Sequence, residues 1–490
     1  MPPEMQALLD REKDKAKKNK IKNRPIVLMT YMMVIVFLCM FGYIIYFMEV
    51  RSEDVVANAS NKRQDSFAKF VKRGDIITDD GTVVATTEVD DAGNEKRVYP
   101  YGGMFAHTVG YNSYGRSGIE LAYNFDLMRS HINIGQMVYN DLADVKNPGD
   151  NVIMTLDYNL QNTAAETLGN VRGAVVVLDA STSKVLCMYS SPTFDPNDID
   201  NVWESVHSEE GSQSTVLLNR ATQGLYAPGS TFKVITAMEY IREHPDYENY
   251  THLCNGTDIF NSVSIRCSNS TAHGQVDLTS SLAHSCNTSF ADIGTNYLDM
   301  DSLADFSEDL LYNKDIPFKG NTSKPVFTLN GKSDISEIPQ TVIGQGNTLT
   351  TPLHNALIMQ AIANGGYMME PMLVSRLENA DGGVVKTYKP KSYGQVIEPQ
   401  VTKEIIPMLE AVCTSGTASS YMAGKPYTVA GKTGTAEYDN NGNCNSWFVG
   451  FSTSDKPDIV VSVVVEDYTS NQLSGTYVAS RLMDQYYNDH

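Results

Sequence analysis

An uncharged run near the N-terminus limits what this chain can fold into more than any other feature. The run IVLMTYMMVIVFLCMFGYIIYFM extends over about 23 residues, from Ile26 to Met48. A helix of that length, at about 1.5 Å per residue, crosses a bilayer core of about 30 Å. A helix in a soluble core rarely needs so long an uncharged run, and a cleavable signal peptide has a shorter apolar region. The sequence therefore predicts a retained transmembrane helix over residues 25–48.

Charged residues beside this run predict its orientation. The first 24 residues carry eight Lys and Arg side chains against four acidic ones, whereas Glu49, Glu53 and Asp54 follow the run. Basic flanks remain on the cytoplasmic side of a membrane. We therefore expect a single-pass protein of the cell membrane, with residues 1–24 as a cytoplasmic basic tail and everything after residue 48 extracytoplasmic.

Length and charge narrow the possible functions. A chain of 490 residues is too long for one hydrophobic core, so at least two folded units are expected. The net charge is -20 although the tail is basic, so the remainder is strongly acidic. An acidic region without a stripe of Lys and Arg has no groups that bind the phosphates of a nucleic acid. We therefore expect no nucleic acid partner.

The sequence after the membrane run divides at about residue 150. Residues 49–150 are expected to form a small β-rich pedestal outside the membrane. Within them, two apolar runs around Asp79, Asp80 and Gly81 predict a β-hairpin.

Residues 151–490 predict an α+β domain. A strand passes into a helix after Asn151, and GAVVVLD and KVLCMYS follow as a hairpin. Strand-like segments return near the C-terminus, before a closing helix. Helical segments are expected in between, around residues 231–242, 278–297 and 352–364. Because strands precede and follow these helices, the two ends of the domain are expected to meet in one sheet.

A serine and a lysine in YAPGSTFKVITAMEYI carry the first chemical signal. Pro228 and Gly229 end a loop, and Ser230 begins a run of helix-compatible residues. Lys233 lies three positions later, on the same helix face and about 5 to 6 Å away. Free N–H groups at a helix start favour an anion that develops on an acyl carbonyl there. Ser230 is therefore a candidate nucleophile with a possible base beside it.

The S-x-x-K pattern alone is weak, because it also occurs by chance. Ser66 with Lys69 and Ser181 with Lys184 match it without the loop-to-helix context, and an exposed Lys beside a Ser explains both. Two further elements strengthen the match at Ser230. The first is Ser285-Cys286-Asn287 between apolar segments, and the second is the run Lys432, Thr433, Gly434 and Thr435 in a strand-like segment. Taken singly, the first element would be explained by a polar break between helices, and the second by a surface β-turn.

In the order S-x-x-K, S-x-N and K-T-G, these elements resemble the signature of serine penicillin-recognising enzymes. The resemblance covers about residues 151–490, and RGDIITDDG is similar to the membrane-proximal region of class B (monofunctional) penicillin-binding proteins. Further similar segments are PTFDPN at 192–197, GQGNTLTTPL at 344–353 and WFVGF at 447–451. The resemblance implies a transpeptidase domain with a mixed sheet flanked by helices, above a dimerisation-like pedestal. Asp80 stands where the pedestal motif usually carries Arg, which puts one local contact in doubt.

The same resemblance implies a peptidoglycan D,D-transpeptidase. Its substrates are stem peptides that end in D-Ala-D-Ala, and β-lactams are covalent inhibitors. Ser230 attacks the penultimate carbonyl, and the amine of a neighbouring stem then resolves the acyl-enzyme. Lys233 is expected to act as general base, with its pKa lowered by burial and by the positive Lys432.

The other motif residues receive roles by the same resemblance. Ser285 relays a proton toward the leaving amine, and Asn287 hydrogen-bonds the substrate amide. Lys432 supplies positive charge, while Thr433 and Thr435 hold the terminal carboxylate. The small Gly434 lets the substrate backbone come close. The N–H groups of Ser230 and Thr435 would form the oxyanion hole.

Cysteine spacing leaves a question open. Cys254 and Cys267 bracket a short loop, and both a disulfide and two free thiols are compatible with that spacing. Cys286, inside the S-x-N element, is expected to be unpaired, and Cys286→Ala is expected to leave acylation largely intact. Because no CxxC pair or HExxH motif occurs, no metal is expected, and the chemistry needs no cofactor.

Several other functions share parts of this pattern. A D,D-carboxypeptidase is the main alternative, and a serine β-lactamase would need a dedicated deacylating residue that the sequence does not identify. A β-lactam receptor would need further spans or an effector domain, and a scaffold with a decayed site would not keep all three motifs. The resemblance also implies a SEDS-type glycan polymerase as a membrane partner.

Overall fold

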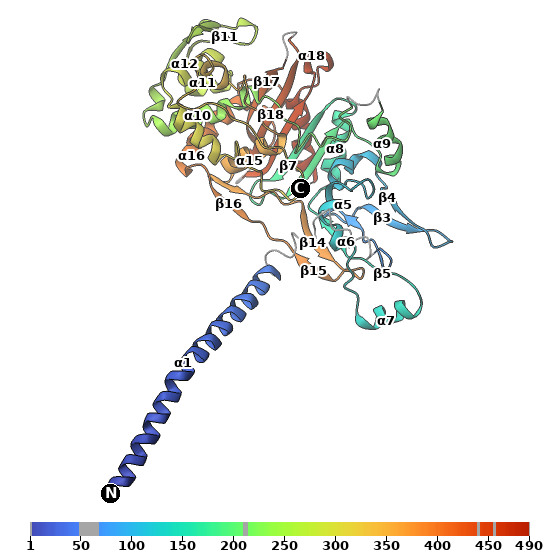
Figure 1. Cartoon of the computed structure of the whole chain (residues 1–490). Coiled ribbons are helices and arrows are strands. Elements are labelled where there is room, and N and C mark those ends of the chain that lie inside the picture. The colour runs from blue at the N-terminus through green and yellow to red at the C-terminus, as the bar shows by residue number, and fades with distance from the viewer. Residues whose placement is uncertain (1, 49–67, 209–213, 439–441, 454–456, 490) are drawn as a thin grey trace. The chain divides into compact units, whose positions relative to one another are not determined.

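The computed structural model describes residues 2–48, 68–208, 214–438, 442–453 and 457–489 (Figure 1). The chain forms two units, Met1–Arg63 and Gln64–His490, and each is described by itself. The first contains helix α1, Pro3–Tyr46. Within α1, Arg24–Tyr46 has a mean hydropathy of 2.3 and is long and apolar enough to cross a membrane. The basic tail belongs to the same helix, which agrees with its content of Leu, Ala, Lys and Glu, all good helix formers.

A five-stranded sheet forms the centre of the second unit. Its order is β17-β18-β19-β7-β8, and every neighbouring pair is antiparallel. The strands are β7 (Gly173–Asp179), β8 (Val185–Ser191), β17 (Thr428–Glu437), β18 (Cys444–Thr453) and β19 (Pro457–Val465). Strands from both ends of the predicted α+β domain therefore share one sheet, as expected.

Helices cover both faces of this sheet, as burial along β7 shows. Six of its seven residues are buried, which requires cover on each side. The terminal pair α8 (Tyr158–Leu168) and α19 (Gly475–Asp489) contact each other and strands β8, β18 and β19. Helix α15 (Pro352–Ala363), buried on all sides, contacts β7, β18 and β19, and α16 (Pro399–Thr414) contacts β17. Figure 1 shows α8 and α15 on opposite sides of the sheet.

A second, mixed sheet has the order β15-β14-β6-β2-β3-β4. Its strands are β2 (Ile76–Ile77), β3 (Val83–Val89), β4 (Glu95–Val98), β6 (Asn151–Met154), β14 (Val374–Glu378) and β15 (Val384–Thr387). The pair β2 and β3 is antiparallel, so the predicted hairpin is confirmed. This sheet continues across residue 150, because β6 pairs with β2 on one side and with β14 on the other.

Asp80 has a clear structural place in the hairpin turn. One carboxylate oxygen accepts hydrogen bonds from the Thr78 hydroxyl and the Thr82 N–H, and the other accepts from the N–H of Tyr158, the first residue of α8. Gly81 has a φ of 89°, a conformation that glycine adopts without strain. The carboxylate therefore ties the hairpin to the start of α8.

The predicted helix over residues 278–297 is two helices, so this prediction is wrong in one respect. Helix α11 (Leu278–Ala283) ends before the motif, and α12 (Asn287–Asn296) begins inside it. Ser285 between them has a φ of 57°, in the left-handed region that cannot continue a right-handed helix. The polar S-x-N element is thus a tight break.

The other helical predictions agree more closely with the structure. A short 3₁₀ turn, η4 (Gly229–Thr231), precedes helix α10 (Lys233–Glu243). The segments predicted around residues 352–364 and at the C-terminus correspond to α15 and α19. Four short strands follow α10: β9 (His252–Cys254), β10 (Thr257–Phe260), β11 (Val263–Arg266) and β12 (Gly274–Val276).

Candidate active site

Ser230 lies on η4, the turn that leads into α10. Its side chain is half-buried, and within the described residues its hydroxyl has no hydrogen-bond partner. Lys233 begins α10 three positions later, as the sequence predicted. The nucleophile candidate therefore stands at a helix entrance with its oxygen available to an incoming group.

Close backbone contacts hold the Ser230 turn in place. The Gly229 N–H donates to the Gly344 carbonyl at 2.9 Å. A Cβ on Gly344 would lie 1.9 Å from the Gly229 carbonyl oxygen, so only glycine fits there. A Cβ on Gly434 would meet Thr231 Cγ2 and Trp447 Cβ, each at 3.0 Å. The turn is thus pressed between the loop that contains Gly344 and strand β17.

Lys233 is fully buried, and its ammonium group faces the S-x-N element. Its Nζ donates to the Ser285 carbonyl oxygen at 2.8 Å, to Ser285 Oγ at 3.2 Å and to Asn287 Oδ1 at 2.5 Å. Burial lowers the pKa of Lys233 to about 8, as expected, while Cys286 and Cys267 act in the opposite direction. The expected effect of Lys432 on this pKa is not among the causes. A substantial share of Lys233 is therefore neutral near physiological pH, and a neutral amine can accept a proton.

The left-handed backbone at Ser285 explains how one residue offers two acceptors to Lys233. At a φ of 57° its carbonyl and its hydroxyl both lie within hydrogen-bond distance of Nζ. A non-glycine residue in this region costs about 1–2 kcal/mol, and such strain is concentrated at functional sites. Asn287 is also fixed on both sides, because its Nδ2 donates to the Arg266 carbonyl at 2.7 Å.

Strand β17 supplies the third element along the edge of the five-stranded sheet. Lys432 is fully buried, and its Nζ donates to the Thr433 carbonyl at 3.0 Å. Burial lowers the pKa of Lys432 well below its usual value, and the nearby Lys233 ammonium lowers it further. Two buried amines thus share one site, which favours the entry of a compensating anion.

The side chains that follow Lys432 alternate between the two faces of β17. Gly434 is buried against the Ser230 turn, whereas Thr435 is exposed. The half-buried Thr433 shares a hydrogen bond of 2.6 Å with the hydroxyl of Thr417. Two hydroxyls are therefore paired beside the Lys432 strand, where a carboxylate could accept from them.

The structure brings the predicted elements together from three separate segments. Ser285 and Asn287 accept hydrogen bonds from Lys233. The charge of Lys233 lowers the pKa of Lys432, and Gly434 packs against the turn that contains Ser230. The Ser181 match lies in the β7–β8 turn, where its hydroxyl donates to Asp179. Ser66 lies outside the described residues.

Sequence reasoning missed three supports of this site. Gly344 and Trp447 were noted only as parts of similar segments, without a role, yet Gly344 holds the Ser230 turn. Trp447 is fully buried and donates from Nε1 to the Ala227 carbonyl at 3.1 Å, just before the turn. Thr417 has no local signal, because its N–H reaches the Ala283 carbonyl only through tertiary folding.

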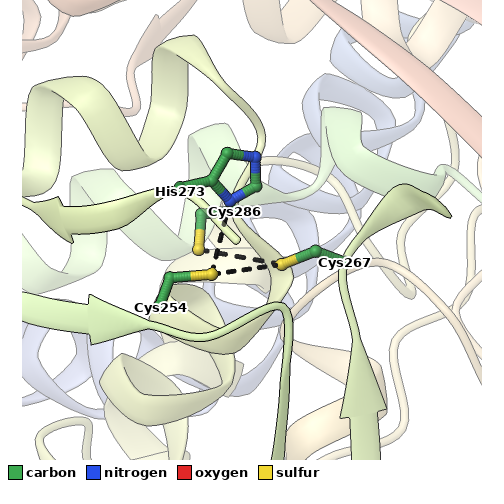
Figure 2. Close-up of side chains that lie close together, drawn as sticks. All are labelled: Cys254, Cys267, His273 and Cys286. Carbon is green, nitrogen blue, oxygen red and sulfur yellow. Dashed lines mark hydrogen bonds between the residues drawn. The ribbon is translucent and has the colours of Figure 1, made fainter. Parts of the chain in front are cut away.

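Of the two arrangements that the spacing allowed, the structure has two free thiols and not a disulfide. Cys254 and Cys267 are unbonded, with 3.7 Å between their Sγ atoms, so the structure contains no disulfide between them. Cys286 has no disulfide partner, as expected, but its Sγ lies 3.9 Å from that of Cys267. His273, which the sequence did not single out, completes a group of four possible metal ligands (Figure 2).

Comparison with known families extends over most of the chain. Residues 173–486 match the family described as Penicillin binding protein transpeptidase domain. Residues 73–152 match the Penicillin binding protein A dimerisation domain. The first match contains all eight motif residues, from Ser230 to Thr435.

Known proteins of similar length align with this chain. Peptidoglycan D,D-transpeptidase PbpA of Mycolicibacterium smegmatis is 29% identical over 429 residues, which cover 83% of this chain and 86% of that protein. The D,D-transpeptidase domain of a peptidoglycan glycosyltransferase from Eggerthella lenta is 30% identical, with a TM-score of 0.75, over 85% of this chain and 98% of that one. Penicillin-binding protein A of M. tuberculosis, as a penicillin G acyl-enzyme complex, is 25% identical with a TM-score of 0.73, over 85% and 99%.

Proposed function

This chain belongs to the penicillin-binding protein transpeptidase family, and from that premise we propose that Ser230 is the nucleophile of a peptidoglycan D,D-transpeptidase. The protein cross-links peptidoglycan and is acylated by β-lactams. The observation that carries the assignment of Ser230 is the Lys233 ammonium, buried and hydrogen-bonded to the S-x-N element three positions after Ser230. The residues around the Lys233 amine supply the proton transfers of the proposed reaction.

Acylation needs a base, a proton relay and an anion site. Neutral Lys233 takes the Ser230 proton as Oγ attacks the penultimate carbonyl of a D-Ala-D-Ala stem. Lys233 Nζ lies 3.2 Å from Ser285 Oγ, so that hydroxyl can pass the proton to the departing D-Ala amine. Among the described residues, Lys233 Nζ donates to Ser285 and Asn287 and makes no hydrogen bond to Ser230. This agrees with catalytic hydrogen bonds that tighten only around a substrate.

Two features would hold the ends of the substrate. The terminal carboxylate of the stem peptide pairs with Lys432 and with the Thr433 and Thr435 hydroxyls, and this anion favours the charged form of the buried Lys432. The carbonyl oxygen accepts from the N–H groups of Ser230 and Thr435 as it becomes an oxyanion. The edge position of β17 supports the second role, because alternate N–H groups of an edge strand face away from its neighbour.

A direct assay separates transpeptidation from hydrolysis. Purified full-length protein in detergent is given a D-Ala-D-Ala donor with an amine acceptor, and the products are resolved by mass. We expect a cross-linked product that grows with acceptor concentration, because the amine competes with water for one acyl-enzyme. Free D-Ala with only trimmed donor at every acceptor concentration would assign a D,D-carboxypeptidase instead.

The anchor supports a membrane-bound protein, and its flanking charges support one orientation. We propose that α1 crosses the cell membrane once with residues 1–24 in the cytoplasm, because the basic residues precede the apolar window. Residues 49–150 would then be the extracytoplasmic pedestal and residues 151–490 the transpeptidase domain. A cysteine placed at Ser52 should react with an impermeant maleimide on intact cells, and a cysteine at Ala7 should not. The reverse pattern would reject this orientation.

A membrane partner that makes the glycan strands would supply the substrate of this enzyme. We propose a polytopic SEDS-type glycan polymerase, bound through α1 and the pedestal. The test is co-purification of such a polymerase before and after residues 26–48 are replaced by an unrelated apolar helix. Unchanged recovery would remove α1 from the interface.

A further inference from the structure

Four possible metal ligands converge beside the active site. Cys254, Cys267 and Cys286 are buried and His273 is half-buried, and their ligand atoms all lie within 4.8 Å of one another. Figure 2 shows the three sulfurs and the imidazole directed toward a common centre. Three cysteines and one histidine form a common ligand set of structural zinc sites.

The distances between the ligand atoms fit a tetrahedral ion. Bonds of about 2.3 Å to sulfur and about 2.0 Å to nitrogen place tetrahedral ligands about 3.8 Å apart for two sulfurs and about 3.5 Å apart for sulfur and nitrogen. The observed separations are 3.7 Å for Cys254 and Cys267, 3.9 Å for Cys267 and Cys286, and 3.4 Å for Cys254 Sγ and His273 Nδ1. Ordinary packing does not require this spacing among three thiols and an imidazole.

The local fold also directs backbone hydrogen bonds at two of the four ligands, Cys254 and Cys267. Cys254 ends β9 and Cys267 follows β11, while His273 precedes β12, which pairs with β9. The Gly256 N–H donates to Cys254 Sγ at 3.4 Å, and backbone groups of Asn287 and Thr288 at the start of α12 hydrogen-bond Cys267. N–H donors at a helix start stabilise negative charge. A disulfide between two of the cysteines would leave the third sulfur and the imidazole unexplained.

From these four ligands we infer that the protein binds one Zn²⁺ ion at Cys254, Cys267, His273 and Cys286, and that this ion holds the S-x-N element in position. Three thiols lose their protons when the ion binds. Cys286 lies between Ser285 and Asn287, the two residues whose oxygens accept hydrogen bonds from Lys233. The ion fixes Cys286 and, through the backbone, both acceptors.

Metal content tests the site without reference to catalysis. The full-length protein, purified in detergent under reducing conditions and offered Zn²⁺, should contain about one zinc per chain. Cys254→Ser, His273→Ala and Cys286→Ala should each lose most of this metal. Cys187→Ala is the matched control, because Cys187 is a buried thiol in β8 outside the cluster, and it should keep the zinc. Metal-free wild-type protein, or equal zinc in Cys254→Ser, would overturn the inference, as would a Cys254–Cys267 disulfide in freshly isolated protein.

A chelator test avoids variants that fail to fold. Removal of the ion from wild type should lower the melting temperature by more than about 5 °C, and added Zn²⁺ should restore it. Co²⁺ in place of Zn²⁺ should give the absorption bands of tetrahedral thiolate coordination. No change in melting temperature in a protein whose zinc has been removed would reject a structural role.

The link to the active site rests on the proposed function and has its own readout. Metal removal should slow acylation by penicillin about 10- to 100-fold, the range found when groups that support a metal site are lost. Cys286→Ala, expected from sequence alone to be nearly silent, should show the same loss. Ser230→Ala should not label but should still hold zinc, so failure of the zinc site and failure of the nucleophile assignment are distinguishable. An unchanged acylation rate in metal-free protein would end the positioning role.

Discussion

Ser230→Ala should abolish covalent labelling by a fluorescent penicillin. A β-lactam acylates the nucleophile, and its tethered leaving group blocks the acceptor, so wild-type protein should retain about one label per chain. The variant lacks the attacking oxygen. Because Ser230 is half-buried and its hydroxyl has no partner among the described residues, the change should alter stability by less than about 0.5 kcal/mol. Gel fluorescence and thermal unfolding measure both results.

A matched control comes from the same short pattern elsewhere. Ser181→Ala removes a serine with a lysine three positions later, but in an exposed turn where the hydroxyl bonds Asp179. It should label like wild type. Label that persists in Ser230→Ala would reject the site assignment, and label that vanishes from wild type within seconds would indicate a β-lactamase.

Lys233→Met should slow penicillin acylation by at least about 100-fold, the usual cost of losing a general base. Methionine keeps most of the volume of this fully buried side chain but cannot accept the Ser230 proton. It also leaves the Ser285 carbonyl and Asn287 Oδ1 without their donor, so some loss of stability is expected. Lys184→Met, the matched change in the β7–β8 turn, should acylate normally.

The pH dependence of acylation separates a base from a merely structural lysine. Burial lowers the pKa of Lys233 to about 8, so the protonated, inactive form dominates below that pH. The wild-type rate should rise about tenfold per pH unit on the acid side and level off above pH 8. Burial is the largest cause of this lowered pKa, and negative charge on Cys286 and Cys267 opposes it. The residual rate of Lys233→Met should lack the acidic limb. A flat wild-type profile from acid to neutral pH would exclude Lys233 as the base.

Patterns that repeat locally were readable from the sequence. Hydropathy alone located the apolar part of α1, and alternating apolar runs located the β2–β3 hairpin. The meeting of β7 with β19 followed from the order of strands and helices. Ser230 and Lys233 were identifiable because both lie within one turn of chain.

Features made by distant contacts were not readable. Ser285 has a left-handed backbone where its oxygens accept hydrogen bonds from the distant Lys233. Residue propensity alone predicts that the helix continues through this position. Gly344 is needed only because the Gly229 carbonyl lies against it. The four ligands stand 13, 6 and 13 positions apart, without any CxxC pair, so only the pairing of β9 with β12 and the start of α12 bring them together.

The mixed six-stranded sheet makes folding of the N-terminal segment a late event. Strands β2, β3, β4 and β6 are synthesised early, but β6 finds its second neighbour only when β14 has been made. Until then β6 is an open edge whose unpaired backbone groups can recruit other strands. A ribosome that stalls, or a protease that cuts, between β6 and β14 would therefore leave a fragment prone to aggregation. The ribosome therefore has to synthesise the chain well beyond Ser230, as far as β14, before β6 has both of its neighbouring strands.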